Sequence, residues 1–144
     1  MTRNGGRGYY FEDLRVGQEA SRSNLVTEQV IIAFAEVSGD ANPVHLDPVY
    51  AAGTPFKERI AHGVLSAAFV SAVVGMDLPG PGAIYVSQTL NFRAPVKIGD
   101  TVVATVSIIE LMAKRRAKFS TVCTVAGKTV VEGEAVMMVP GRPA

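Results

Sequence analysis

The chain has 144 residues, of which 48% are hydrophobic and 19% charged, and its formal net charge at pH 7 is +1. This composition excludes a mostly disordered chain, and the near-neutral charge gives no reason to expect a nucleic-acid partner. The length predicts a single domain with a substantial core. The longest uncharged helical run, residues 63–76, is too short to span a bilayer, and no signal peptide is apparent, so we expect a cytoplasmic protein without a membrane segment.

We expect the ordered domain to cover residues 9–140, between a flexible N-terminus at 1–8 and a flexible C-terminus at 141–144. The first eight residues are polar and rich in glycine, and a Pro-Gly-Arg-Pro sequence ends the domain. Residues 18–26 predict a polar edge strand.

Three helices are expected in the first half of the chain. Residues 28–38 have apolar side chains at helical spacing, with Thr27 as the N-cap and Gly39 as a left-handed cap. A short helix follows from Pro48, and residues 54–60 are predicted to be irregular. The third helix, residues 63–76, is apolar on every side, so it must be surrounded by protein.

In the second half, apolar side chains recur at every second residue. This alternation predicts strands over residues 84–93, 101–110, 117–125 and 129–139. Wrapping this antiparallel sheet around helix 63–76 gives an α+β architecture of the kind called a hot-dog fold. Such a sheet has exposed edges, and a homodimer would cover them. The single cysteine, Cys123, lies in an alternating apolar run, which predicts a buried and inert thiol.

Asp40 and His45 are the strongest candidates for chemistry. Each alone has an ordinary interpretation: an Asp after a helix cap is common in turns, and a lone His often belongs to a core. The combination Gly-Asp-x-Asn-Pro-x-His, over residues 39–45, is a long constraint. It sets an acid and a base five residues apart in a rigid bend, where they could hold one water molecule between two proton-transfer groups. Such a pair of groups suits the addition of water to, or its removal from, a carbon skeleton activated by a carbonyl.

The sequence Ser-Gly-Asp-Ala-Asn-Pro-Val-His-Leu-Asp, residues 38–47, resembles the signature of the MaoC-like, (R)-specific enoyl-CoA hydratases, known as hydratase 2. The resemblance continues through residues 62–65, 92–96 and 99–100 and covers roughly residues 11–139. It implies reversible hydration of a trans-2-enoyl-CoA to the (R)-3-hydroxyacyl-CoA on a hot-dog domain. The implied substrate is an acyl-CoA or acyl-carrier-protein thioester, with no cofactor, since coenzyme A is part of the substrate and lies along the dimer interface.

The resemblance also implies roles for individual residues. Asp40 and His45 match the catalytic pair that activates water, and Asn42 matches the amide that orients the water or the pair. Gly63 matches the backbone N–H that binds the thioester oxygen, and Ser71 matches a further polar position in the central helix. The physical chemistry agrees for Gly63, because free amides at a helix start suit a developing enolate oxygen. His62 could support the helix start or line the pocket, and we favour the structural role at the helix start.

Several alternatives stay open at this point. A thioesterase on the same fold could use a carboxylate and a water, and a non-catalytic acyl-binding subunit would have the same fold. Metal-dependent hydrolysis is not expected, because two His and one Cys show no ligand spacing of the usual kind. Basic side chains could bind the phosphates of coenzyme A, although charge runs on hairpin turns are usually solvated; the candidates are Arg93, Lys97, Lys114, Arg115, Arg116 and Lys118.

Overall fold

The computed structural model describes residues 8–144, so most of the predicted flexible N-terminus lies outside the described residues. After a 3-10 helix at Phe11–Asp13, the chain forms four helices and six strands within this range. The helices are α1 (Glu28–Ser38), α2 (Pro43–Leu46), α3 (Pro48–Ala52) and α4 (Gly63–Met76). The strands are β1 (Glu19–Leu25), β2 (Ile84–Gln88), β3 (Asn91–Phe92), β4 (Thr101–Met112), β5 (Arg116–Val125) and β6 (Lys128–Met138).

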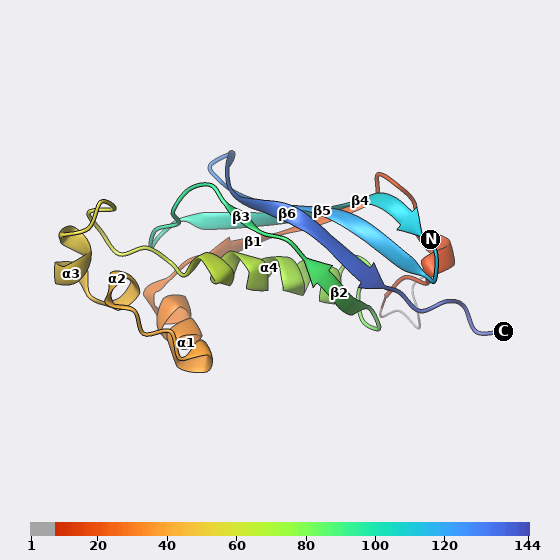
Figure 1. Ribbon diagram of the computed structural model, residues 1–144, viewed down its shortest axis with the longest axis horizontal. Helices are drawn as coiled ribbons and strands as arrows, with labels where there is room; N and C mark the ends of the chain where they lie inside the picture. The colour runs from red at the N-terminus through yellow and green to blue at the C-terminus, as the bar shows by residue number, and fades with distance from the viewer. Residues whose placement is uncertain (1–7) are drawn as a thin grey trace.

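The six strands form one antiparallel sheet in the order β1-β4-β5-β6-β2, with β3 also paired to β6. Helix α4 runs along one face of this sheet, and α1, α2 and α3 gather beyond its N-terminal end (Figure 1). The predicted α+β hot-dog architecture is therefore confirmed. Among residues 8–144, no helix combines the length and apolar character needed to cross a membrane.

The strands bury alternate side chains against α4, as a sheet with one covered face requires. Every second residue is buried over residues 102–108 of β4 and 117–123 of β5, including Val106, Ile108 and Phe119, each at most 1% exposed. Cys123 is also buried, and its thiol lies 3.6 Å from the carbonyl oxygen of Ser66 in α4. The prediction of a buried cysteine is confirmed, and burial raises the pKa of its thiol to about 11.

Helix α4 has the predicted bounds but is not surrounded within one chain. Its Leu65, Val70 and Val73 face the sheet, whereas Val64 and Met76 are 55% and 54% exposed. The apolar pattern all round the helix predicted complete burial, and a single copy of the chain covers only one side. The exposed side therefore lacks its covering layer in the isolated chain.

The prediction of one continuous strand over residues 84–93 was wrong, because the strand is interrupted between β2 and β3. The register between β2 and β6 shifts between Tyr85 and Ser87, and the chain resumes pairing only at Asn91 in β3. At the interruption a Cβ built on Gly133 would overlap the carbonyl oxygen of Thr89. The close backbone approach needs glycine on the neighbouring strand, and a period-two pattern does not reveal such a bulge.

The helical caps were predicted correctly, and one helix was missed. Thr27 accepts a hydrogen bond from the Val30 N–H, and Gly39 has φ 81°. The rigid bend predicted after Gly39 contains a single helical turn, α2, because Pro43 follows the Asn42 cap at its first position. In the C-terminal segment predicted to be flexible, the Arg142 N–H donates to Glu12 Oε1 at 2.7 Å.

Candidate active site

Two capped helix ends position Asp40 and His45. Asp40 directly follows the left-handed Gly39 that closes α1, so its backbone leaves the helix in a defined direction. His45 lies on α2, and only 8% of it is exposed. The Asp40 carboxylate accepts a hydrogen bond from the Asn42 N–H at 3.2 Å, a local turn that holds one of its oxygens.

The His45 ring is oriented by the segment that precedes α4. Its Nδ1 lies 2.8 Å from the carbonyl oxygen of Ile60, and since a carbonyl only accepts, Nδ1 carries the proton. The Nε2 atom is then the ring nitrogen that this hydrogen bond leaves free. Arg59 donates from Nε to the His45 carbonyl at 2.7 Å and pairs with Glu28 at 2.8 Å, which ties α2 to α1.

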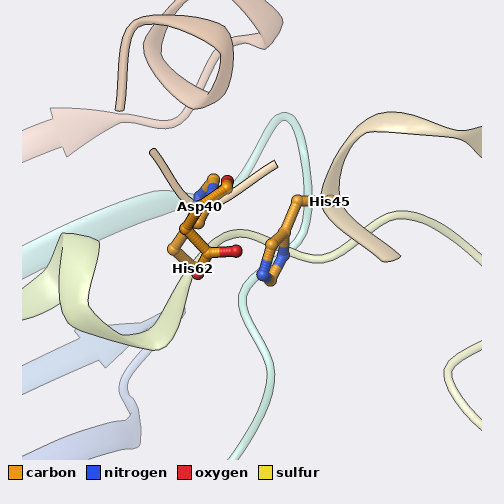
Figure 2. A group of neighbouring side chains, drawn as sticks. All are labelled: Asp40, His45 and His62. Carbon is orange, nitrogen blue, oxygen red and sulfur yellow. The ribbon is translucent and has the colours of Figure 1, made fainter. Parts of the chain in front are cut away.

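Asp40 and His45 face each other at a distance that suits one water molecule. One nitrogen or oxygen atom from each of Asp40, His45 and His62 lies within 4.8 Å of the others. Two hydrogen bonds of about 2.8 Å meeting at a tetrahedral water oxygen separate their outer atoms by about 4.6 Å. Figure 2 shows an Asp40 carboxylate oxygen directed toward the His45 ring, with the two side chains entering from opposite sides.

Asn42 lies between the pair in sequence and acts locally as a helix cap. Its side-chain Oδ1 accepts a hydrogen bond from the Val44 N–H at 3.2 Å, at the start of α2. The side chain is exposed, and its amide nitrogen remains available for another acceptor. Asn42 therefore contributes first to the placement of His45, through the helical turn that carries this residue.

Gly63 begins α4 beside His45. As the first helical residue its N–H has no intrahelical partner, and it lies at the positive end of the helix dipole. Gly63 and both imidazoles line a cavity of about 350 Å³. The other lining residues are Phe56, Ile60, Ala61, Ser66, Phe92, Arg93, Ala94, Pro95, Val96 and Val131. The structure thus brings three predicted site residues, Asp40, His45 and Gly63, to one end of the molecule.

Ser71 is not part of this group. It lies eight residues after Gly63 in α4, which corresponds to about 12 Å along the helix axis. Its side chain is exposed and lines a separate apolar groove of about 480 Å³ between α4 and β2. Residues 64, 67 and 68 of α4 line the same groove, so Ser71 belongs to the uncovered side of the helix.

The basic residues fall into two sets. Arg93 lines the cavity and pairs with Glu132 at 2.9 Å, and Lys97 pairs with Glu58 at 3.4 Å. The remaining four, Lys114, Arg115, Arg116 and Lys118, lie at or near the turn between β4 and β5. The 12 residues of β4 extend roughly 40 Å from its start, near the site, to this turn, at the opposite end of the molecule (Figure 1).

Three residues make contacts within the site that the sequence did not predict. His62 is 3% exposed and stacks on His45, with ring centroids 3.9 Å apart. Phe92 lies over Gly63, and Arg59 holds the backbone of His45. These contacts join residues 14 to 29 positions apart, and local spacing carries no signal for such contacts. For His62 the prediction of a role at the helix start is consistent with its position as the N-cap residue of α4.

Asp40, His45 and His62 each offer one possible ligand atom for a metal ion, and these atoms lie within 4.8 Å of one another. The His45 and His62 rings stack with centroids 3.9 Å apart and an interplanar angle of 30°. Zinc lies about 2.0–2.1 Å from each imidazole nitrogen that binds it, so the stacked rings would have to turn before both could bind one ion.

Fold and site together define a hot-dog domain that holds a carboxylate and an imidazole close together at one end. Residues 14–133 match the model of the MaoC like domain, and the chain belongs to this family. The chain is 56% identical over 135 residues to an (R)-specific enoyl-CoA hydratase of Rhodospirillum rubrum, covering 93% of this chain and 94% of that protein. It is 50% identical over 137 residues to a 3-hydroxybutyryl-CoA dehydratase of Methylorubrum extorquens, covering 94% and 87%.

A solved structure supports the same relationship. The R-hydratase PhaJ1 from Pseudomonas aeruginosa, in its unliganded form, superimposes with a TM-score of 0.90 at 47% sequence identity. The match covers 94% of this chain and 88% of that one. The resemblance drawn from residues 38–47 is therefore confirmed at the level of the family and of the fold.

Proposed function

We propose that this protein catalyses the (R)-specific hydration of trans-2-enoyl-CoA to (R)-3-hydroxyacyl-CoA, and the reverse dehydration. The protein is a hydro-lyase, as are the relatives named hydratase and dehydratase at 56% and 50% identity. The observation that carries the mechanism is the Asp40–His45 pair, held within 4.8 Å, with His45 and Gly63 lining the same cavity.

In this proposal Asp40 and His45 hold one water molecule between them. The water oxygen forms a bond to C3 of the enoyl thioester, and the pair takes up the proton that the water loses. The electron pair of the C2–C3 double bond moves toward the thioester carbonyl. The pair then returns a proton to C2 on the same face, so that one water is added and the enzyme is unchanged.

Gly63 is proposed to stabilise the charge that develops on the thioester oxygen. Its N–H lacks an intrahelical partner and lies at the positive end of α4, so a negative oxygen is favoured there over a neutral one. The difference in binding between the enolate and the ground state is what lowers the barrier. Asn42 supports the pair by capping α2.

We propose that the substrate is an acyl-CoA thioester and that no metal or separate cofactor takes part. Two relatives are named for CoA esters, which favours coenzyme A over an acyl-carrier protein. Arg93 and Lys97 are the basic candidates for the coenzyme A phosphates, because they lie beside the cavity. The turn between β4 and β5 would reach a phosphate only on a partner subunit.

We further propose that the protein is a homodimer that covers the open side of α4 and the edge strand β2. Ile84 is 61% exposed and Val86 is 42% exposed, and both lie next to the groove that contains Ser71. A second copy would satisfy the unpaired backbone of β2 and bury this apolar surface. Ser71 would then lie at the interface between the subunits.

The test is an assay of purified protein with a series of trans-2-enoyl-CoA substrates of increasing acyl length. Hydration is followed by the loss of enoyl-thioester absorbance, and the configuration of the product is determined by chiral analysis. We expect the (R)-3-hydroxyacyl-CoA as product. A thioesterase would release free thiol instead, and an acyl-binding subunit would change neither signal, so these two alternatives would each be recognised.

A further inference from the structure

His62 contacts both members of the proposed catalytic pair. Its Nε2 lies 2.9 Å from the main-chain oxygen of Asp40, and its ring stacks on that of His45 at 3.9 Å between centroids. We propose that His62 is a positioning residue that sets the distance between Asp40 and His45, and hence the site of the bound water. This inference rests on the proposed function and names a further residue of the same site.

The hydrogen bond to Asp40 links two parts of the chain that are 22 residues apart. Because a carbonyl oxygen only accepts, Nε2 of His62 carries the proton and donates it. Asp40 lies in an exposed loop between α1 and α2, where its other contacts are local, to Ser38 and Asn42. The bond from His62 therefore fastens this loop to the start of α4, where Gly63 is the next residue.

The stacking contact restrains His45. One edge of the His45 ring is held by the Ile60 carbonyl, and His62 covers one of its faces. His62 is itself packed by Phe34, whose ring centroid is 4.9 Å away at a tilt of 54°. His45 and His62 are nearly excluded from solvent, with 8% and 3% of their surface exposed, respectively. The imidazole of His45 is thus held in one orientation, which is the preorganisation that proton transfer requires.

His62 also carries a cost in folding free energy that a purely structural residue would not need. Its Nδ1 is buried and has no hydrogen-bond partner among residues 8–144. A buried polar atom without a partner destabilises the folded state. A phenylalanine at this position would keep the stacking ring, remove the unpartnered atom and lose only the bond to Asp40. Stability and activity should therefore change independently in such a variant.

The closing experiment compares His62→Phe, His62→Gln and His62→Ala with the wild-type enzyme. For His62→Phe we expect kcat to fall at least tenfold, with KM within about threefold of the wild type and the melting temperature unchanged or higher. His62→Gln should retain more activity than His62→Ala, because its amide can still donate to the Asp40 carbonyl. Val70→Ala, a buried change in the same helix, is the matched control: it should lower the melting temperature and leave kcat unchanged.

Nuclear magnetic resonance supplies a readout that does not depend on turnover. The chain has only two histidines, so a long-range ¹⁵N–¹H spectrum contains two imidazoles, and His62→Phe identifies each. We expect the Nε2–H tautomer for His62 and a shift of the His45 signals in the variant. Wild-type kcat in His62→Phe, or the Nδ1–H tautomer for His62, would overturn the role of His62. Failure of the wild type to hydrate any enoyl thioester would instead count against the proposed function, and the tautomer would still decide the His62 contact.

Discussion

The ring of Phe92 occupies the space that a side chain at Gly63 would need. A Cβ built on Gly63 would lie 2.9 Å from both Cδ1 and Cε1 of Phe92, closer than carbon atoms pack. A side chain at Gly63 would therefore displace the Phe92 ring, the start of α4 or both. The start of α4 therefore packs against strand β3 through Gly63 and Phe92. The Gly63 N–H, which is proposed to stabilise the thioester oxygen, lies at this contact.

This contact predicts the behaviour of a double-mutant cycle. Gly63→Ala should lower kcat/KM by about 10²-fold, because a shift of about 1 Å at a reacting centre has effects of this size. Phe92→Ala in the Gly63→Ala background should recover part of the loss, since the obstructing ring is gone. The control is Gly53→Ala, where the nearest atom to a new Cβ is 3.5 Å away. Steady-state kinetics of Gly63→Ala, Phe92→Ala, the double variant and the Gly53→Ala control decide the matter; a double variant no better than Gly63→Ala alone would contradict the prediction.

Removal of either proposed catalytic group should abolish most of the turnover and leave the fold intact. We expect Asp40→Asn and His45→Gln each to reduce kcat by about 10²–10⁴-fold, the usual contribution of general acid–base catalysis. The measurement is hydration of an enoyl-CoA, with circular dichroism to check folding. Glu36→Gln, an exposed carboxylate on the neighbouring helix α1, should behave as the wild type. Near-normal turnover in both site variants would remove the mechanism.

Two substitutions at Asn42 separate capping from any direct contact with the water. Asn42→Asp keeps an oxygen that can accept from the Val44 N–H, and Asn42→Ala does not. We expect Asn42→Ala to cost about 1 kcal/mol of stability and to lower turnover by displacing His45. Asn42→Asp should keep most of the activity, as measured by thermal unfolding and kcat. An inactive but fully stable Asn42→Asp would show that the amide nitrogen itself is needed.

The proposed dimer predicts that a charge on the edge strand lowers the oligomeric state. Ile84→Lys places a cation on β2 at a position that is 61% exposed in the single chain. We expect light scattering coupled to size exclusion to show a dimer for the wild type and a larger monomer fraction for this variant. Val37→Lys, 83% exposed on α1, is the control and should remain dimeric. Equal masses for all three proteins would show that β2 is not the interface.

Cys123 should be unreactive in the folded protein. Burial raises the pKa of its thiol to about 11, so at pH 8 the thiolate that reacts with disulfide reagents is a very small fraction. A thiol-specific chromogenic reagent should therefore modify less than one tenth of the protein before denaturant is added, and the full amount afterwards. Fast stoichiometric labelling of the native enzyme would mean that the strand around Cys123 opens readily.

Much of the fold follows from local patterns. The bounds of α1 and α4, the cap at Thr27 and the short helix from Pro48 were all predicted correctly, because caps and helical spacing are properties of neighbouring residues. The split between β2 and β3 was not predicted. It depends on the approach of Thr89 to Gly133, two residues 44 positions apart, and an alternating pattern is the same with or without that approach.

Residues 39–45 by themselves predicted Asp40 and His45 as the reacting pair, because a tight turn holds both groups at a short and predictable separation. The tertiary structure decided what surrounds them. His62, Arg59 and Phe92 reach the site from other segments, and Ser71 lies on a different face of α4. The direction of a side chain in space depends on how distant segments pack, and packing is set by the whole core rather than by the spacing within any one segment.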